Sequence, residues 1–304
     1  MWNGTRDMIK ARPTNGTCAV VVTYHPADSV FEHLSTLHSQ AQGLVVVDNG
    51  STPAVLVKMR IESEAVGFHL IENGENRGVA AALNTGIRWA IESKYEWVAL
   101  FDQDSSIPDC YFDTMLGKVA SSATPEKIGI VAPLYRDPST GSLDNPSPGK
   151  DDTLWAVMTS GSLMPVWIFE KCGWFEEEFF IDQIDDEYCF RIQTMGYKIE
   201  VCENAILLHT PGAPQPHKLL GIKWVRSRHY SAGRRYYITR NGLIMVRRYR
   251  KQCPVWSRST LEYLLFKDPI IIILVESDRI NKLVNVARGV IDAYLGRMGK
   301  RVNL

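Results

Sequence analysis

The sequence contains few cysteines, and none of them form a pair with metal-binding spacing. Its six cysteines are scattered over 304 residues without a C-x-x-C pair. This pattern argues against a zinc site and against a disulfide framework, and it favours a reducing environment such as the cytoplasm. We therefore expect the fold to depend on its hydrophobic core alone.

The sequence also lacks the long apolar runs that membrane insertion requires. The longest aliphatic run, from Ile270 to Val275, is far shorter than the roughly 20 residues that span a bilayer. The first 17 residues are polar and contain no apolar core of a signal peptide. We therefore expect a cytoplasmic protein that is not integral to a membrane.

Acidic residues are absent from one long stretch of a chain whose net charge is zero. From Arg226 to the end, 17 Lys and Arg stand against 5 Asp and Glu, and the segment from Arg226 to Arg258 has ten basic residues and no acidic one. This division predicts two parts with different partners, a first domain at residues 1–220 and a basic, mainly helical region at residues 221–304. Because no RNA- or DNA-binding motif accompanies the basic block, we do not expect nucleic acid as a partner.

Strand-like and helix-like segments alternate along the first two thirds of the chain. This alternation is typical of βαβ units and predicts an α/β fold with a mostly parallel sheet and helices on both faces. After Pro216 the sequence becomes basic and aromatic, with helical patterns at Lys223–Arg250 and Ser257–Leu295. The strand-like segments are Cys18–Thr23, Leu44–Val47, Phe68–Ile71, Trp97–Asp102, Ile128–Ala132, Leu154–Met158, Ser162–Met164 and Ala205–Leu208. The helical segments are Asp28–Gln40, Gly78–Ser93, Pro108–Ser121 and Asp182–Met195.

One apolar strand ends abruptly in two carboxylates, Asp102 and Asp104. In an extended chain these two side chains point to the same side, and in an open α/β sheet the ligand crevice lies beyond the carboxyl ends of the strands. Mg²⁺ is usually held by one or two carboxylates together with substrate phosphates. The pair therefore predicts a metal-diphosphate site. Taken alone, the pair is more typical of a solvated turn than of a metal site.

Polar side chains also follow other predicted strands, at the point where each strand ends. Asp48, Asn73 and His209 come directly after three of these strands. The carboxyl ends of parallel strands in an α/β fold lie at the same edge of the sheet. Polar residues at several of these ends therefore indicate a polar crevice that binds a phosphorylated, metal-bound ligand.

With these motifs on several strand ends, the chain resembles the inverting glycosyltransferases of family 2, which have the GT-A fold. The resemblance runs from about Val20 to Gly212 and is closest to the bacterial rhamnosyltransferases that build O-antigen and related polysaccharides. The stretches that carry it are Val22-Thr23-Tyr24-His25-Pro26, Val47-Asp48-Asn49-Gly50-Ser51, Asn76-Arg77-Gly78, Phe101-Asp102-Gln103-Asp104-Ser105, Thr159-Ser160-Gly161, Phe180-Ile181-Asp182 with Asp185, and His209 with Gly212.

The resemblance implies roles for the residues at the strand ends. It implies that the donor nucleotide is held by the residues Thr23, Tyr24, Asp48, Asn76, Arg77, Gly78, Asp102 and Gln103. It further implies that Mg²⁺ or Mn²⁺ is held by Asp102 and Asp104, with His209 as a third ligand. Local alternatives stay open: an Asx-turn for Asp48, helix capping for Asn76 and a structural role for His209.

Four acids crowd the start of the predicted helix near residue 184, at Asp182, Asp185, Asp186 and Glu187. Helix capping explains one or two acids there, but four repel one another. The resemblance places the catalytic base at Asp185. Because Ile184 replaces the more common Glu of the family motif, Asp186 remains a second candidate.

In the basic region, four residues resemble a pattern that follows the catalytic domain in rhamnosyltransferase-like members. Arginine suits bidentate contact with a diphosphate, either that of the donor or that of a lipid-linked acceptor. Interleaved Tyr and Trp also suit an anionic membrane surface, and a solvated basic face or an oligomer contact is the plainer alternative. The four residues are Arg234, Arg235, Tyr236 and Arg240.

The resemblance thus implies inverting transfer of a deoxysugar, L-rhamnose from dTDP-β-L-rhamnose, to a hydroxyl of a growing, lipid-linked polysaccharide at the inner face of a bacterial plasma membrane. The alternatives are a transferase that uses UDP-hexoses, a nucleotidyltransferase, or a non-catalytic module that binds sugar nucleotides. A nucleotidyltransferase would normally carry a Gly-rich basic loop after its first strand, where this chain has Thr23-Tyr24-His25-Pro26.

Overall fold

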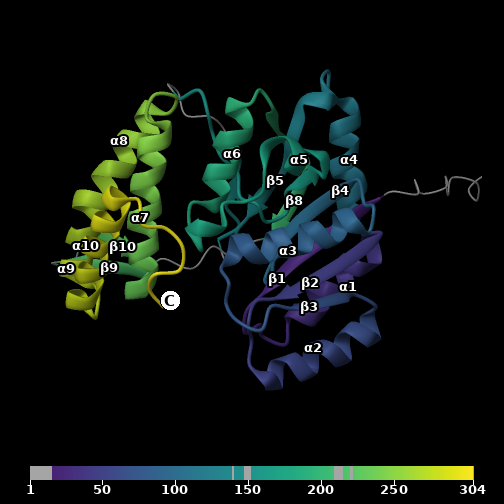
Figure 1. Ribbon diagram of the computed structural model, residues 1–304, viewed down its shortest axis with the longest axis horizontal. Coiled ribbons are helices and arrows are strands. Elements are labelled where there is room, and N and C mark those ends of the chain that lie inside the picture. Colours follow the sequence, from purple (N-terminus) through teal and green to yellow (C-terminus); the bar gives the residue numbers. More distant parts are fainter. Residues whose placement is uncertain (1–15, 139, 147–151, 209–214, 220–221, 304) are drawn as a thin grey trace, which may run out of the picture.

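The computed structural model describes residues 16–138, 140–146, 152–208, 215–219 and 222–303. An eight-stranded sheet forms the centre of the first two thirds of the chain, in the order β3-β2-β1-β4-β7-β5-β6, with β8 paired to β5 (Figure 1). The strands are β1 (Thr17–Thr23), β2 (Gly43–Asp48), β3 (His69–Glu72), β4 (Trp97–Asp102), β5 (Ile128–Arg136), β6 (Leu143–Asp144), β7 (Leu163–Pro165) and β8 (Lys198–Leu208).

The sheet is parallel where the polar strand ends lie. Strands β3, β2, β1 and β4 run parallel to one another, and β8 runs parallel to β5. The short strand β7 is antiparallel to both β4 and β5. The predicted α/β fold with a mostly parallel core is therefore confirmed, with β7 joining its two parallel parts.

Helices cover both faces of the sheet because successive strand residues point to opposite sides. Along β1, Cys18 and Val20 enter one core cluster, whereas Ala19 and Val21 enter the other. The first cluster packs against α3, α5 and α6, and the second packs against α1 and α4. The helices of this part are α1 (Val30–Gln40), α2 (Pro53–Val66), α3 (Val79–Glu92), α4 (Tyr111–Ser121), α5 (Trp167–Cys172) and α6 (Ile184–Thr194), with short 3-10 turns η1 (Pro125–Lys127) and η2 (Glu177–Phe179).

The C-terminal part is helical, as predicted, and packs against the sheet part beside α6 (Figure 1). Ile244, Met245 and Tyr249 of α7 belong to the same core cluster as β1 and α6. No helix among the described residues is long and apolar enough to cross a membrane. The elements are a hairpin of β9 (Gln215–Leu219) and β10 (Ile222–Ser227), then α7 (Ala232–Tyr249), α8 (Pro254–Glu262), a π-helical turn η3 (Tyr263–Lys267), α9 (Asp268–Val275) and α10 (Arg279–Leu295).

Two local predictions were wrong, and one helix was missed. Residues 154–158 form no strand, because the Gln193 side chain, rather than a neighbouring strand, bonds the backbone of Trp155. The helix expected from Lys223 begins only at Ala232, since the preceding segment pairs as β10. Helix α2 was not predicted, because Met59 is its only buried residue and its apolar periodicity is weak.

Candidate active site

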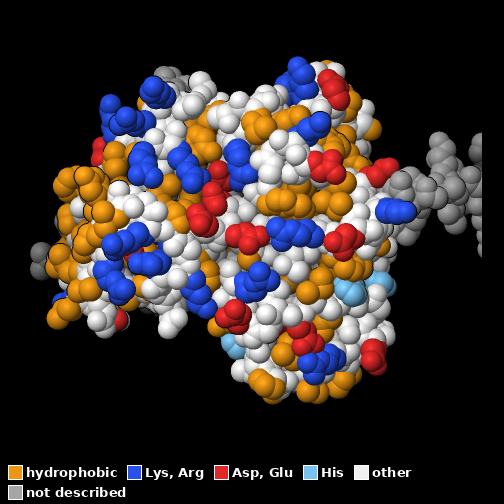
Figure 2. Space-filling model, in the orientation of Figure 1, with side chains coloured by type: hydrophobic (Ala, Val, Ile, Leu, Met, Phe, Trp, Pro, Cys, Tyr) orange, Lys and Arg blue, Asp and Glu red, His pale blue; other side chains and the backbone are white. Residues whose placement is uncertain are grey.

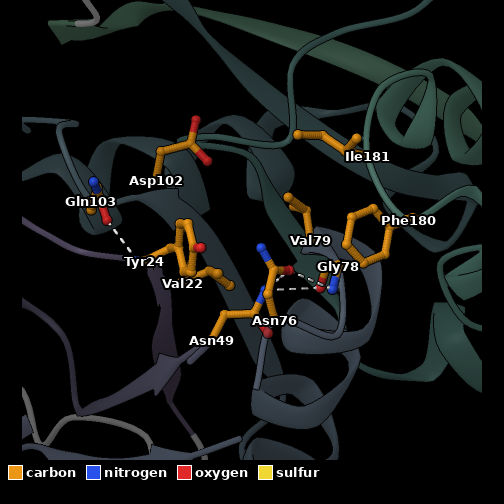
Figure 3. Close-up of a pocket in the computed structure, with 10 residues that line it drawn as sticks. All are labelled: Val22, Tyr24, Asn49, Asn76, Gly78, Val79, Asp102, Gln103, Phe180 and Ile181. Atoms are coloured by element: carbon orange, nitrogen blue, oxygen red, sulfur yellow. Dashed lines mark hydrogen bonds between the residues drawn. The ribbon is translucent and has the colours of Figure 1, made fainter. Parts of the chain in front are cut away.

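A cavity of about 250 Å³ opens at the carboxyl ends of the parallel strands. Five separate segments of the chain line it, which brings together most of the strand ends that the sequence singled out (Figure 3). Its lining residues are Val22 and Tyr24 at the end of β1, Asn49 after β2, Asn76, Gly78 and Val79 at the start of α3, Asp102 and Gln103 at the end of β4, and Phe180 and Ile181 before α6.

Asp48 and Thr23 are completely buried and do not line this cavity. The Asp48 carboxylate accepts hydrogen bonds from the Thr23 hydroxyl at 3.2 Å, the Ser51 hydroxyl at 2.5 Å and the Ser51 backbone N–H at 2.8 Å. It also accepts one from the Gly50 backbone N–H. This arrangement is the local turn left open as an alternative, and it shapes the loop that presents Asn49.

Asn49 connects the end of β2 to the loop before α3. Its amide nitrogen donates to the Asn76 side chain and to the Gly78 carbonyl, both at 3.2 Å, and its amide oxygen accepts from the Arg77 backbone N–H at 3.1 Å. Gly78 has φ +91°, and a Cβ there would lie 2.6 Å from the Phe180 carbonyl oxygen. Only glycine allows this close approach. The neighbouring Arg77 side chain is exposed to solvent.

The turn after β4, which we call the first acid turn (Asp102–Ser105), presents its carboxylates to solvent. Both Asp102 and Asp104 are exposed, and Asp102 borders the cavity. The Gln103 side chain accepts from the Tyr24 backbone N–H at 2.8 Å, which closes the cavity wall between β1 and β4 (Figure 3). Ser160 accepts from the Asp102 backbone N–H at 3.2 Å and bonds the Ser105 hydroxyl at 2.7 Å.

A divalent metal fits the chemistry of this turn. Two exposed carboxylates one residue apart offer the hard oxygen ligands that Mg²⁺ and Mn²⁺ take. Among the described residues no group of three or more His, Cys, Asp and Glu is close enough to hold an ion. His209, the predicted third ligand, lies outside the described residues.

The turn that leads into α6 is strained. We call it, together with the first three residues of that helix, the second acid turn (Phe180–Asp186). Phe180, Asp182 and Gln183 have φ of 67°, 63° and 64°, a left-handed conformation that non-glycine residues seldom adopt. Such conformations persist where the surrounding structure holds them, and they cluster at functional sites. Here the chain turns sharply beside the cavity and then enters α6 at Ile184.

The Asp185 carboxylate bonds the Thr159 side chain and does not cap its own helix. Its carboxylate accepts the Thr159 hydroxyl at 2.9 Å, and α6 has no side-chain capping bond at its N-terminus. Burial, followed by the negative charges of Asp102 and Asp186, raises the pKa of Asp185 to about 7. Burial and the charge of Asp182 raise the pKa of Asp186 to about 6. A carboxyl group whose pKa lies near neutrality can both accept and release a proton.

Arg234 is the member of the predicted basic set that reaches the second acid turn. Its guanidinium donates to both carboxylate oxygens of Asp182, at 3.0 and 3.2 Å, and stacks over the Tyr230 ring. Burial raises the pKa of Asp182, and the charge of Arg234 opposes that rise. Asp182 therefore has a cationic partner, and no ion pair among the described residues involves Asp185 or Asp186.

Arg235, Tyr236 and Arg240 are buried, so the structure does not offer them to a ligand. Arg235 pairs with Asp268 and Glu276 inside the helical part, and the Tyr236 hydroxyl donates to Asp292. The Arg240 guanidinium donates to the carbonyls of Glu178 and Phe179, at 2.9 and 3.1 Å, and to that of Gly299. Most of their polar atoms thus already have protein partners, and of the four residues only Arg234 stays half-exposed.

The sequence interpretation assigned no role to several residues that shape the site. Thr159 and Ser160 connect the two acid turns, and they stood in the sequence as part of the Thr-Ser-Gly stretch. Asn241 is completely buried, and its amide nitrogen donates to the carbonyls of Phe179, Ile181 and Asp182 at 2.7 to 3.0 Å. Its position beside Arg240 was the only sequence signal for it.

The chain is similar in sequence to known glycosyltransferases. The sequence model of the family described as Glycosyl transferase family 2 matches residues 18–140. The chain is 29% identical over 242 residues to the dTDP-rhamnosyl transferase RfbF of Shigella flexneri, covering 76% of this chain and 79% of RfbF.

Solved structures share the fold. The mannosyltransferase PcManGT of Pyrobaculum calidifontis, solved with GDP-Man and Mn²⁺, is 18% identical with a TM-score of 0.52, and the match covers 93% of this chain and 76% of that one. Residues 1–349 of S. aureus TarS, solved with UDP-GlcNAc, are 14% identical with a TM-score of 0.52, over 91% of this chain and 81% of that one. At these identities the likeness shows a GT-A-like fold.

Proposed function

We propose that this glycosyltransferase, which carries a family 2 domain, moves L-rhamnose from dTDP-β-L-rhamnose to a hydroxyl of a growing, lipid-linked polysaccharide with inversion. The observation that carries the proposal is the placement of two different acid turns beside one cavity at the strand ends. RfbF, which is named as a dTDP-rhamnosyl transferase, supports the choice of donor.

The cavity has the chemistry of a nucleoside site. Aromatic and apolar side chains such as Tyr24, Val22 and Phe180 suit the face of a base, and the amides of Asn49 and Asn76 suit its polar edge or a ribose. In this arrangement Thr23 and Asp48 contribute indirectly, because their hydrogen bonds hold the loop that carries Asn49.

The donor is tested by a thermal-shift comparison of nucleotides, because a ligand that binds only the folded state raises the melting temperature. With Mn²⁺ present, dTDP should raise it more than equal concentrations of UDP or GDP. Equal shifts for all three nucleotides would remove the support for rhamnosyl transfer and would favour a transferase for another nucleotide sugar, such as a UDP-hexose.

Asp102 and Asp104, with His209 as the predicted third ligand, would hold Mg²⁺ or Mn²⁺ at the end of β4. When bound there, the ion supplies positive charge that stabilises the diphosphate leaving group. Ser160 keeps the turn in place by accepting from the Asp102 backbone, and Gln103 bonds the neighbouring strand end.

Asp185 is proposed to accept the proton of the acceptor hydroxyl as its oxygen attacks the anomeric carbon. The new C–O bond forms as the bond to the diphosphate oxygen breaks, and the electron pair leaves with dTDP. A single displacement inverts the anomeric centre, so no covalent intermediate is needed.

A non-catalytic binding module is the competing hypothesis, and it predicts that the protein binds sugar nucleotides without transferring or hydrolysing them.

The helical part is proposed to rest on an anionic membrane surface at the inner face of the plasma membrane. Eleven of the eighteen large hydrophobic side chains that the described residues expose lie between Tyr263 and Leu295. Figure 2 shows hydrophobic side chains gathered around α9 and α10 with basic side chains beside them. Exposed Lys267, Arg279 and Arg288 belong to the same segment. Soluble proteins seldom expose apolar side chains in one area without a partner.

Vesicle binding tests this placement. The protein should sediment with vesicles that contain phosphatidylglycerol at low salt and less so at high salt, because salt screens the basic residues. Phe266→Ser should weaken the binding, and Leu143→Ser, an exposed apolar position in the sheet part, should not. If the protein ignores these vesicles at low salt, the apolar surface has another partner, such as a second copy of the chain.

A further inference from the structure

A second cavity, of about 260 Å³, lies between the second acid turn and the C-terminal helices. Helices α7 and α8 and the turn η3 form most of its wall, and Gln183 closes it on the side of the sheet. None of the described residues that line it carries a charged side chain. Its lining residues are Gln183, Ile238, Gly242, Trp256, Ser259, Thr260, Tyr263 and Leu264.

The second acid turn contributes to both cavities. Phe180 and Ile181 line the first cavity, and Gln183, two residues further on, lines the second. Asp185 follows after one helical residue. A ligand in the second cavity would therefore lie next to the turn that carries the proposed base.

Gln183 carries a polar atom that the described residues leave unpaired. Its side-chain oxygen is buried and has no hydrogen-bond partner among them. Buried polar atoms without a partner are unfavourable and uncommon in folded proteins. If the Gln183 side chain turned toward the second cavity, this oxygen would accept a hydrogen bond from a ligand hydroxyl there and the penalty would be removed.

The lining of the cavity has the character of a carbohydrate site. Trp256 and Tyr263 offer aromatic rings to the apolar C–H face of a sugar, while Ser259 and Thr260 offer hydroxyl groups to its polar rim. The described lining residues include no Lys or Arg. A diphosphate bound there would lose its hydration without gaining a cationic partner, so the cavity is unsuited to it.

We propose that the second cavity binds a neutral saccharide ring of the acceptor and leads its hydroxyl group toward Asp185. This inference rests on the proposed glycosyl transfer and adds the location and the chemical class of the acceptor subsite. It also gives the C-terminal helices a place in the reaction, since α7, α8 and η3 supply seven of the eight lining residues.

The experiment is saturation-transfer NMR with methyl α-L-rhamnopyranoside and methyl N-acetyl-β-D-glucosaminide, in the presence of dTDP and diamagnetic Mg²⁺. Two variants change the cavity: Ser259→Trp places a large ring at a lining position, and Thr260→Val removes one hydroxyl at nearly constant volume. Val255→Ala, an exposed position on the same helix outside the lining, is the matched control. Circular dichroism confirms that each variant is folded.

At least one glycoside should give a signal with the wild type and with Val255→Ala. Filling the cavity should lower its affinity by at least about tenfold, because the ligand and the new ring compete for the same space. Inorganic phosphate should not displace the glycoside. No signal for either glycoside, or equal binding by the wild type and both cavity variants, would overturn the proposal. Binding of dTDP, followed in the same samples, reports on the donor site independently, so a failure of the proposed function remains distinguishable.

Discussion

The two acid turns contain the same chemical group in opposite surroundings. In the first acid turn, Asp102 and Asp104 are exposed at the end of β4. In the second, Asp185 and Asp186 are half-buried at the start of α6, and burial together with neighbouring negative charge raises the pKa values of both carboxyl groups. Environment, rather than residue type, therefore separates the two turns.

This difference assigns different chemistry to each turn. Exposed carboxylates can surround a hydrated cation and a diphosphate with little rearrangement. A half-buried carboxyl group with a pKa near 7 is suited to take a proton from an attacking hydroxyl. Thr159 and Ser160 connect the two turns physically, since Thr159 bonds Asp185 and Ser160 bonds the backbone of Asp102.

The second turn also depends on the C-terminal region, unlike the first. Asn241 and Arg240 of α7 donate to the backbone carbonyls of residues 178, 179, 181 and 182, on both sides of the left-handed residue Phe180. The basic region that looked like a separate partner surface in the sequence is therefore part of what shapes the site.

Removal of the metal should have the largest effect and act through the first turn alone. We expect EDTA to lower the transfer rate by at least about 10³-fold, because the leaving diphosphate loses its counter-charge. Asp104→Asn should weaken Mn²⁺-dependent binding of dTDP, as measured by calorimetry. Full activity in EDTA would mean that Asp102 and Asp104 are polar contacts at most, and the contrast between the turns would lose its basis.

The pH dependence should report the second turn. A base works in its deprotonated form, so the transfer rate should fall by roughly tenfold per pH unit below the pKa of Asp185. That pKa is about 7 in the metal-free protein and lower once a bound cation offsets the charge of Asp102. The rate is measured from pH 4.5 to 8.5 at saturating donor and metal. A flat profile over this whole range would exclude Asp185 as the titrating base.

The same pKa predicts an effect on stability with a definite sign. The pKa of Asp185 lies above its ordinary value of 3.8, so the folded state binds more protons than the unfolded state between these two values. This carboxyl group therefore stabilises the fold below about pH 4 and loses that contribution as the pH rises through about 7. In EDTA, the melting temperature of Asp185→Asn should fall less than that of the wild type between pH 5 and pH 8.

Removing the hydrogen bonds that Asn241 of α7 donates to the second acid turn should have the smallest of these effects. Asn241→Ala removes hydrogen bonds to the carbonyls of Phe179, Ile181 and Asp182, and we expect kcat to fall by about tenfold through misplacement of the base. The midpoint of the rate-against-pH profile should shift as well, which a purely structural loss would not cause. Asn281→Ala, at an exposed Asn on α10, is the matched control.

Sequence reasoning predicted the part of the site that local patterns encode. Apolar runs that end in polar residues located the ends of β1, β2 and β4, and the structure gathers these ends around one cavity. Position along the chain did not reveal which side chains face a ligand. Asp48 and Arg240, for example, are both of a type that binds ligands, yet hydrogen bonds to the protein engage both.

Other features had no local signal at all. The left-handed residues Phe180, Asp182 and Gln183 include no glycine, so nothing in the sequence indicated the sharp turn. Tertiary contacts impose it, through Asn241 some sixty residues further along the chain. The second cavity likewise depends on the packing of α7 against α8, which periodicity alone does not predict.

The most direct test of the separation between the turns compares Asp185→Asn with Asp186→Asn. Asparagine keeps the shape of aspartate and can still cap a helix, so both variants should fold and bind dTDP with Mn²⁺ as the wild type does. Transfer by Asp185→Asn should fall by at least about a hundredfold, in line with the loss of a general base, and Asp186→Asn should lose far less. Near wild-type transfer by Asp185→Asn with an inactive Asp186→Asn would move the base to Asp186, and transfer by both at the wild-type rate would contradict a catalytic role for the second turn.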